Sequence, residues 1–152
     1  MKTYVVGFMF DRDLSRVSLI KKNKPEWQAG KFNGIGGKIE EGETAIQAMV
    51  REFQEEAGVF IGEEDWKNFL RIEGKENGDN GRVDGAFSVD FFCTTVGNID
   101  RLRCMTEEEI EVHFVSSITR PGFPCLENIP WVVGLAVDFL RDGRPTFTVA
   151  TY

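Results

Sequence analysis

The sequence predicts an α+β fold, a sandwich in which a mixed β-sheet lies between helices. Short apolar or alternating stretches typical of strands occur along most of the 152 residues. Two longer stretches, residues 45–57 and 129–140, have the apolar spacing and the end signals of helices. Strands and helices do not alternate strictly, as a doubly wound sheet would require. No repeat or linker divides the chain, so we expect one domain over residues 1–152.

The first predicted elements are two neighbouring strands. Residues 3–10, TYVVGFMF, form an apolar run, and residues 16–22, RVSLIKK, follow it across an Asp-rich turn. The next segment, residues 23–43, is rich in glycine and has little periodicity. Loops of that length inside compact domains are usually functional, so we expect part of a site there.

The predicted helix over residues 45–57 has a clear signal at each end. Thr44 and Gln47 have the spacing of a capping box, and Gly58 is a suitable stop after the last turn. At about 100° per residue, one arc of this helix is apolar and should be buried. That arc contains Ile46, Met49, Val50, Phe53 and Ala57.

The second half of the chain repeats these signals. The predicted helix over residues 129–140 follows a potential cap at Asn128 and has Pro130 in its first turn. The turn-rich residues 76–85 separate two of the remaining strand candidates. Those candidates are residues 68–75, 86–96, 110–118 and 146–152.

Composition excludes several classes of function. The net charge is −7 and the pI about 4.8, whereas proteins that bind nucleic-acid polymers carry a basic footprint. Cys93, Cys104 and Cys125 have no C-x-x-C spacing, which argues against a disulfide framework or a zinc site. The apolar run at residues 4–10 is too short for a signal peptide or a membrane span. We therefore expect a cytoplasmic protein that binds neither membranes nor nucleic-acid polymers.

The first predicted helix carries an unusual group of acidic residues. Glu52, Glu55 and Glu56 share an arc of about 100°, although like charges at these spacings repel by roughly 0.2–0.5 kcal/mol per pair. Arg51 is the only basic residue of this helix, so the group is not interleaved with cations as a solvated face usually is. The other residues on the arc are small: Ala45 and Ala48. Clustered carboxylates suit hard divalent cations, and a solvated charged face is the alternative.

The loop and the helix together match one motif completely. The Walker phosphate loop and the dinucleotide fingerprint both fail, because Ile39 occupies a position that each of them needs for another residue. The pattern G-x5-E-x7-R-E-U-x-E-E-x-G-U, with U apolar, fits residues 37–59 in full. Its fixed positions are Gly37, Glu43, Arg51, Glu52, Phe53, Glu55, Glu56, Gly58 and Val59. The chain therefore resembles the Nudix hydrolases, enzymes that cleave nucleoside diphosphates linked to another group.

This resemblance implies a Nudix-type α/β/α sandwich and a set of roles for the box. It implies that Glu52, Glu55 and Glu56, with the Gly37 carbonyl, coordinate Mg²⁺ or Mn²⁺. A metal so placed activates a water and withdraws charge from phosphoryl oxygens, and we expect Glu52 to take the proton. Three further fixed positions are expected to be structural: Glu43, Arg51 and Gly58.

Family members often add one more carboxylate from just before a strand. The sequence TEEEIEVHF offers four candidates: Glu107, Glu108, Glu109 and Glu111. Strand alternation places Glu109 and Glu111 on one side. Glu109 lies five residues before Phe114, a spacing similar to that of nucleotide-sanitising relatives, so we predict Glu109 as the further metal ligand. A solvated turn is the alternative.

The sequence AGKFNGIGGKIEEGET resembles the MutT-type branch, which removes oxidised or damaged nucleoside triphosphates. That likeness implies a base contact by Asn33, whose amide suits a purine edge, although Asn33 could equally serve the glycine-rich turn. The other predicted substrate-binding residues are Trp27, Lys38, Phe123, Glu127 and Asn128. Phe123 could instead belong to the core and Asn128 could be only a helix cap, while His113 is expected to be structural.

The leading hypothesis is a Mg²⁺-dependent hydrolase that converts a nucleoside triphosphate, such as 8-oxo-dGTP, to monophosphate and pyrophosphate. One alternative keeps the chemistry but changes the substrate to ADP-ribose or another nucleoside diphosphate derivative. Another is a nucleotide-binding sensor without catalysis, which would have no need of three metal-binding glutamates. The expected partner is a small nucleotide, and the protein is expected to be a monomer or a homodimer.

Overall fold

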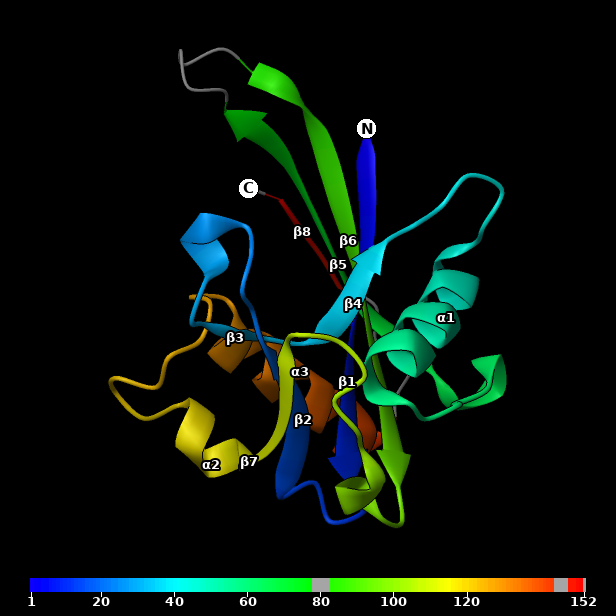
Figure 1. Ribbon diagram of the computed structural model, residues 1–152, viewed down its shortest axis with the longest axis vertical. Helices are drawn as coiled ribbons and strands as arrows, with labels where there is room; N and C mark the ends of the chain where they lie inside the picture. The colour runs from blue at the N-terminus through cyan, green and yellow to red at the C-terminus, as the bar shows by residue number, and fades with distance from the viewer. Residues whose placement is uncertain (78–82, 144–147, 152) are drawn as a thin grey trace.

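The computed structural model describes residues 1–77, 83–143 and 148–151 (Figure 1). Within these ranges the strands are β1 Lys2–Asp11, β2 Arg16–Lys21, β3 Phe32–Asn33, β4 Ile35–Lys38, β5 Lys67–Asn77, β6 Val83–Val96, β7 Glu109–Phe114 and β8 Thr148–Thr151. The α-helices are α1 Ala45–Ala57, α2 Val115–Ile118 and α3 Ile129–Asp142. Short 3₁₀ turns are η1 Glu26–Gln28, η2 Glu63–Asp65 and η3 Ile99–Arg101. None of the helices in these ranges is long and apolar enough to cross a membrane.

The strands form one mixed sheet with the order β3-β2-β1-β6-β5-β8. Strand β1 runs parallel to β6 along its whole length, and β5 runs parallel to β8, while the other pairs are antiparallel. Strand β4 pairs with the first half of β1, and β7 pairs with β2. Figure 1 shows α1 and α3 on opposite sides of this sheet. The predicted α+β class and the α/β/α arrangement are therefore confirmed.

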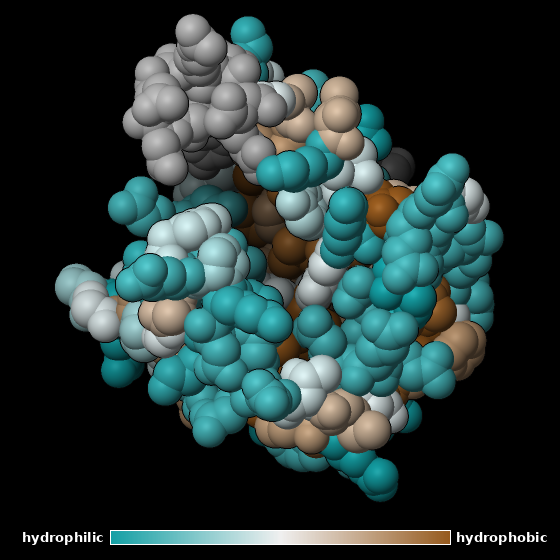
Figure 2. All heavy atoms as spheres, turned by 45° about the horizontal axis from the view of Figure 1, so that its top comes forward, coloured by the Kyte–Doolittle hydropathy of each residue, from teal (hydrophilic) through white to brown (hydrophobic). Residues whose placement is uncertain are grey.

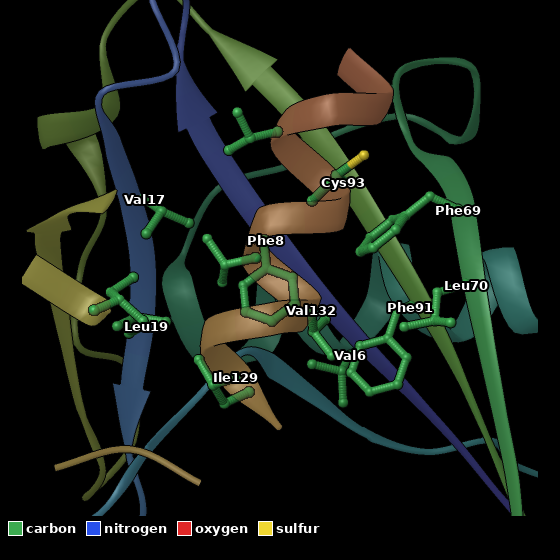
Figure 3. Close-up of a cluster of buried hydrophobic side chains, with 14 of the residues drawn as sticks. Val6, Phe8, Val17, Leu19, Phe69, Leu70, Phe91, Cys93, Ile129 and Val132 are labelled. Carbon is green, nitrogen blue, oxygen red and sulfur yellow. The ribbon is translucent and has the colours of Figure 1, made fainter. Parts of the chain in front are cut away.

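Each face of the sheet has its own hydrophobic core. Alternate residues of β1 divide between the two faces, so Val5 and Met9 pack toward α1, whereas Val6 and Phe8 pack toward α3. Figure 3 shows the second core, where Ile129 and other residues of α3 meet the sheet. A strand buried on both faces must be apolar at nearly every position, which explains the continuous run in the sequence.

Helix α1 has the predicted bounds and both predicted caps. The Gln47 backbone N–H donates to Thr44 Oγ1 at 3.3 Å, and the Thr44 N–H donates to the Gln47 side chain at 3.0 Å. Gly58 adopts the left-handed conformation at φ 67°, which favours glycine. Most of the predicted apolar face is fully buried; Ile46 and Val50 are partly buried.

The structure changes the type or the extent of several predicted elements. The segment 23–43, expected to be a loop, contains β4, because pairing with β1 compensates for the low strand propensity of its glycines. The predicted strand over residues 110–118 ends at Phe114 and continues as α2. The last predicted strand is present as β8, with residues 146, 147 and 152 outside the described ranges. Asn128 precedes α3, but its side chain makes no capping hydrogen bond.

Candidate active site

Arg51 joins α1 to the glycine-rich segment before it. Its Nε and Nη2 atoms donate to the two carboxylate oxygens of Glu43 at 2.8 Å and 2.9 Å. Nη2 also donates to the carbonyl of Lys38 at 3.1 Å. The hydrogen bond to Glu43 is the main cause that raises the pKa of Arg51, and the same bond lowers the pKa of Glu43. This fork fixes the end of β4 against the acidic helix.

The remaining donor of Arg51 is shared by two of the predicted metal-binding glutamates. Nη1 donates to Glu52 at 2.8 Å and to Glu55 at 3.3 Å. The Glu52 carboxylate also lies against the backbone of Gly37, where an added Cβ would lie 2.5 Å from Glu52 Oε1. Burial raises the pKa of Glu52, against the opposing effect of Arg51. Glycine at position 37 therefore leaves the space that the Glu52 carboxylate fills.

Glu56 has a buried carboxylate oxygen, Oε2, without a hydrogen-bond partner in the described part of the chain. Burial raises the pKa of Glu56 to about 7; the Lys22 ammonium opposes this rise, and the carboxylates of Glu52, Glu108 and Glu55 add to it. A buried carboxylate is costly without a partner, so a carboxyl group in this setting suits the binding of a cation.

The extra carboxylate at this cluster is Glu108. Its Oε1 accepts from Lys22 Nζ at 2.8 Å, and its Oε2 accepts from the Asn23 backbone N–H at 2.6 Å. Burial tends to raise the pKa of Glu108, but these hydrogen bonds together lower it. Glu109, predicted as the further ligand, is exposed at the first position of β7, and the structure does not bring it to the cluster. Glu109 was chosen for its spacing to Phe114, whereas Glu108 lies before β7 begins.

The chemistry of these donors fits a hard divalent cation. All the side chains concerned offer carboxylate oxygens, and the orphaned oxygen of Glu56 is an acceptor that no donor of the described residues reaches. The described ranges contain no three acidic, histidine or cysteine side chains already converged on one point. The reason is visible in the contacts, since Arg51 holds Glu52 and Glu55, and Lys22 holds Glu108.

A cavity of about 1100 Å³ opens beside β4 and the glycine-rich segment. Figure 2 shows a hollow with apolar residues at its floor and hydrophilic residues around it. Its lining includes a group of apolar side chains: Val6, Ile72, Phe87, Val89 and Phe91. Four lysines also line it: Lys22, Lys24, Lys31 and Lys38. Because Gly37 belongs to the same lining, the cavity reaches the backbone against which Glu52 lies.

Five of the six predicted substrate-binding residues line this cavity. They are Trp27, Asn33, Lys38, Glu127 and Asn128. Phe123 does not line it; its ring packs 5.7 Å from the ring of Phe32 and 5.2 Å from that of His113, beside the α3 core. Asn33 Oδ1 accepts from the Gly34 backbone N–H at 2.7 Å, so the amide NH₂ is the part of this side chain left to donate.

Four residues near the site were not predicted from the sequence: Lys22, Lys24, Lys31 and Glu108. The lysine-rich residues 21–24 were a usable signal, because they lie where the predicted strand over residues 16–22 meets the long segment expected to be functional. For Glu108 the signal was weaker, since three consecutive glutamates offer no local reason to choose among them. Its contacts with Lys22 Nζ and with the Asn23 backbone N–H, 86 and 85 residues away, separate it from its neighbours.

Comparisons with known proteins give consistent relationships. A family model described as NUDIX domain matches residues 1–118. An "Oxidized purine nucleoside triphosphate hydrolase" from Danio rerio is 46% identical over 43 residues, which are 28% of this chain and 28% of that protein. A MutT protein from Bacillus halodurans has a similar fold, with a TM-score of 0.71 at 18% identity over 100% of this chain and 90% of that one.

The NUDIX domain of NrtR from Shewanella oneidensis, crystallised with ADP ribose, is a further structural relative. It has a TM-score of 0.67 at 14% identity, over 91% of this chain and 87% of that one. Identities this low show a shared fold. The family match, by contrast, spans the strands, the glycine-rich segment and the acidic helix that build the site.

Proposed function

The chain belongs to the NUDIX domain family of pyrophosphohydrolases, and from this premise we propose that it hydrolyses a purine nucleoside triphosphate to monophosphate and pyrophosphate. Oxidised purines such as 8-oxo-dGTP are the leading substrates, and Mg²⁺ or Mn²⁺ is the cofactor. One observation carries this proposal. A cavity with an apolar floor and several lysines reaches Gly37, against which a glutamate of the acidic helix lies.

The acidic cluster supplies the reactive end of this site. The cation would be held by Glu52, Glu55 and Glu56, with the Gly37 carbonyl and Glu108. When bound, it lowers the pKa of a coordinated water and neutralises charge on the phosphoryl oxygens. We assign proton acceptance to Glu52, because its carboxylate lies closest to the cavity lining at Gly37. Arg51 keeps that carboxylate and the end of β4 in fixed relation through Glu43 and Lys38.

The other end of the cavity suits a flat base with a polar edge. The apolar floor can cover the faces of a purine, and Trp27 at the cavity border can stack on it. The NH₂ of Asn33 can donate to a purine acceptor, while Glu127 can accept from a purine N–H group. The partial match to the zebrafish oxidised purine nucleoside triphosphate hydrolase supports the same class of substrate.

A second candidate substrate is ADP-ribose. The structural similarity to a NUDIX domain bound to ADP ribose favours it, and a cavity of about 1100 Å³ is large enough for a dinucleotide-sized ligand. This alternative would use the same acidic cluster but would place a sugar where the triphosphate substrate has its terminal phosphates. We propose the triphosphate because several lysines line the cavity.

We further propose that the protein works as a monomer or homodimer on free nucleotides in the reducing cytoplasm. The three cysteines support a reducing compartment, since all are free thiols. The charge of −7 supports a small nucleotide rather than a nucleic-acid polymer as the partner.

The test is hydrolysis of a panel of normal and oxidised nucleoside triphosphates and ADP-ribose, with product analysis. We expect pyrophosphate release from purine triphosphates, dependence on added Mg²⁺, and loss of at least about a hundredfold in kcat for Glu55→Gln with Glu56→Gln. Activity that persists in EDTA, or in that double variant, would contradict the proposal. Hydrolysis confined to ADP-ribose would select the second candidate.

A further inference from the structure

Lys22 is a mostly buried cation at the junction of the cavity and the acidic cluster. It follows β2 directly, and its Nζ atom lies 2.8 Å from Glu108 Oε1. The side chains of Lys22 and Glu108 expose only 19% and 14% of their surfaces. Lysine is rarely buried to this degree unless paired, so this contact holds the ammonium in place.

The two partners of this ion pair are not equally fixed. The second oxygen of Glu108 accepts from the Asn23 backbone N–H, and the Lys24 N–H also donates to this carboxylate. Lys22 is attached through a flexible four-carbon stem, and it lines the cavity as well as contacting Glu108. The ammonium can therefore change partners while Glu108 stays where it is.

The surroundings of Lys22 are those of a cation site. The positive charge of Lys22 favours the ionised form of Glu56. The Oε2 atom of Glu56 is buried with no hydrogen-bond partner in the described part of the chain. The negative charges of Glu52 and Glu55 disfavour the ionised form of Glu56. Lys22 thus offsets part of the negative charge that the proposed divalent cation would neutralise.

We propose that Lys22 is a tethered cation that exchanges Glu108 for the phosphates of the substrate when the carboxylates take up a divalent metal. The inference rests on the proposed function, since it needs a metal at the acidic cluster. The Lys22 ammonium and a divalent metal repel each other when both lie at the acidic cluster. The carboxylate oxygens bind the divalent metal more strongly, because it carries two charges. Released toward the cavity, the ammonium can bind a polyphosphate through charge-assisted hydrogen bonds.

Arg51 does not have this freedom, although it also contacts the acidic residues. Its fork is held by Glu43 and by the carbonyl of Lys38, neither of which is among the acidic groups acting on Glu56. In the described part of the chain Lys22 pairs with one carboxylate, Glu108, and lines the cavity, whereas Arg51 pairs with several glutamates and does not line it. Lys22 is accordingly assigned as a positioning residue for the phosphates.

The first test is Mn²⁺ binding, measured from the free-ion electron paramagnetic resonance signal without nucleotide. Lys22→Met should tighten Mn²⁺ binding about tenfold, because it removes a competing positive charge. Lys22→Arg keeps the charge and should stay near the wild-type value. Lys31→Met is the matched control, since it loses the same charge from an exposed lysine of the same cavity, and its Mn²⁺ affinity should also stay near wild type.

The second test is calorimetric binding of α,β-methylene-dGTP, whose cleavable bond is blocked, in the presence of Mg²⁺. Lys22→Met should bind this probe about tenfold more weakly, and Lys22→Arg should recover most of the loss. Unchanged or weaker Mn²⁺ binding by Lys22→Met, or an undiminished affinity for the probe, overturns the inference. If the wild type hydrolyses nucleotides with Mn²⁺ bound and these shifts are absent, only the inference fails; a wild type without Mn²⁺ binding refutes the proposed function itself.

Discussion

Arg51 binds both carboxylate oxygens of Glu43, with distances of 2.8 Å and 2.9 Å, across the gap between α1 and the segment that precedes it. The two side chains expose 23% and 14% of their surfaces. Two parallel hydrogen bonds fix the orientation of the guanidinium relative to the carboxylate as well as their separation, whereas a lysine would fix only the separation. The position of the Gly37 carbonyl relative to the acidic helix depends on this contact.

Arg51→Lys should therefore cost both stability and activity. The lysine keeps the charge but loses the paired contact with Glu43 and the bond to the Lys38 carbonyl, a loss of about 2 kcal/mol in the free energy of unfolding. Urea denaturation and steady-state kinetics check this. Arg71→Lys is the control, because Arg71 is similarly forked to Asp90 but does not line the cavity. An Arg51→Lys variant as active and stable as wild type would contradict the role assigned to Arg51.

Glu108→Gln and Glu109→Gln form a pair of neighbouring variants with different expected results. Glu108→Gln removes a charge that acts on Glu56, so kcat should fall at least about tenfold at limiting Mg²⁺. Glu109→Gln alters an exposed side chain and should stay within about twofold of wild type. The measurement is the Mg²⁺ dependence of kcat for each variant. Equal losses of kcat, or a larger loss for Glu109→Gln, would instead support Glu109 as the further metal ligand, as predicted from the sequence.

The metal-free protein should become less stable as the pH rises from about 5 to about 8. The pKa of Glu56 is raised to about 7, so the folded protein still binds a proton that the unfolded chain has released above its ordinary value of 4.5. The unfolded state then binds fewer protons, and the free energy of unfolding falls with pH, by on the order of 2 kcal/mol. The pKa values of Glu43 and Glu108 are lowered, so these residues change the free energy of unfolding only below this pH window.

Thermal denaturation in EDTA across this pH range, for wild type and Glu56→Gln, measures the effect. The variant cannot ionise at position 56, so its stability should depend less on pH. Added Mg²⁺ should stabilise the wild type more at the alkaline end, because the metal binds the deprotonated carboxylate. Identical slopes for wild type and variant would show that Glu56 does not titrate in this window.

Asn33→Asp tests the base contact without disturbing the turn. The aspartate keeps an oxygen to accept from the Gly34 backbone N–H but replaces the donating NH₂ with an acceptor. KM for a purine triphosphate should rise about tenfold or more, with a smaller change in kcat and an unchanged melting temperature. A variant with an unchanged KM would leave Asn33 with the turn role alone.

Local signals were sufficient to predict α1 from the sequence. Its bounds follow from the Thr44–Gln47 capping box and Gly58, which depend only on neighbouring residues. The three acidic positions follow from helical spacing. The predicted positions of Asn33 and Glu127 beside a cavity came instead from a family resemblance, and the structure places both in the same lining.

Features that depend on distant residues were not predictable in this way. Strand β4 forms because Gly36 can approach the Val5 carbonyl, where an added Cβ would overlap it, and no local pattern marks such a position as a strand. Phe123 was expected at the substrate, but its packing against Phe32 and His113 involves three separate segments. The choice between Glu108 and Glu109 likewise depends on Lys22.

The close contact of β4 with β1 bears on how this enzyme could acquire new substrates. Any side chain at Gly36 would push β4 off its neighbour and carry Gly37 away from Glu52. Variants that gain a new specificity should therefore retain both glycines and differ among the residues lining the opposite part of the cavity, where larger or smaller side chains can be accommodated. Selection of randomised libraries for altered nucleotide preference would reveal this division between an invariant strand and a variable cavity wall.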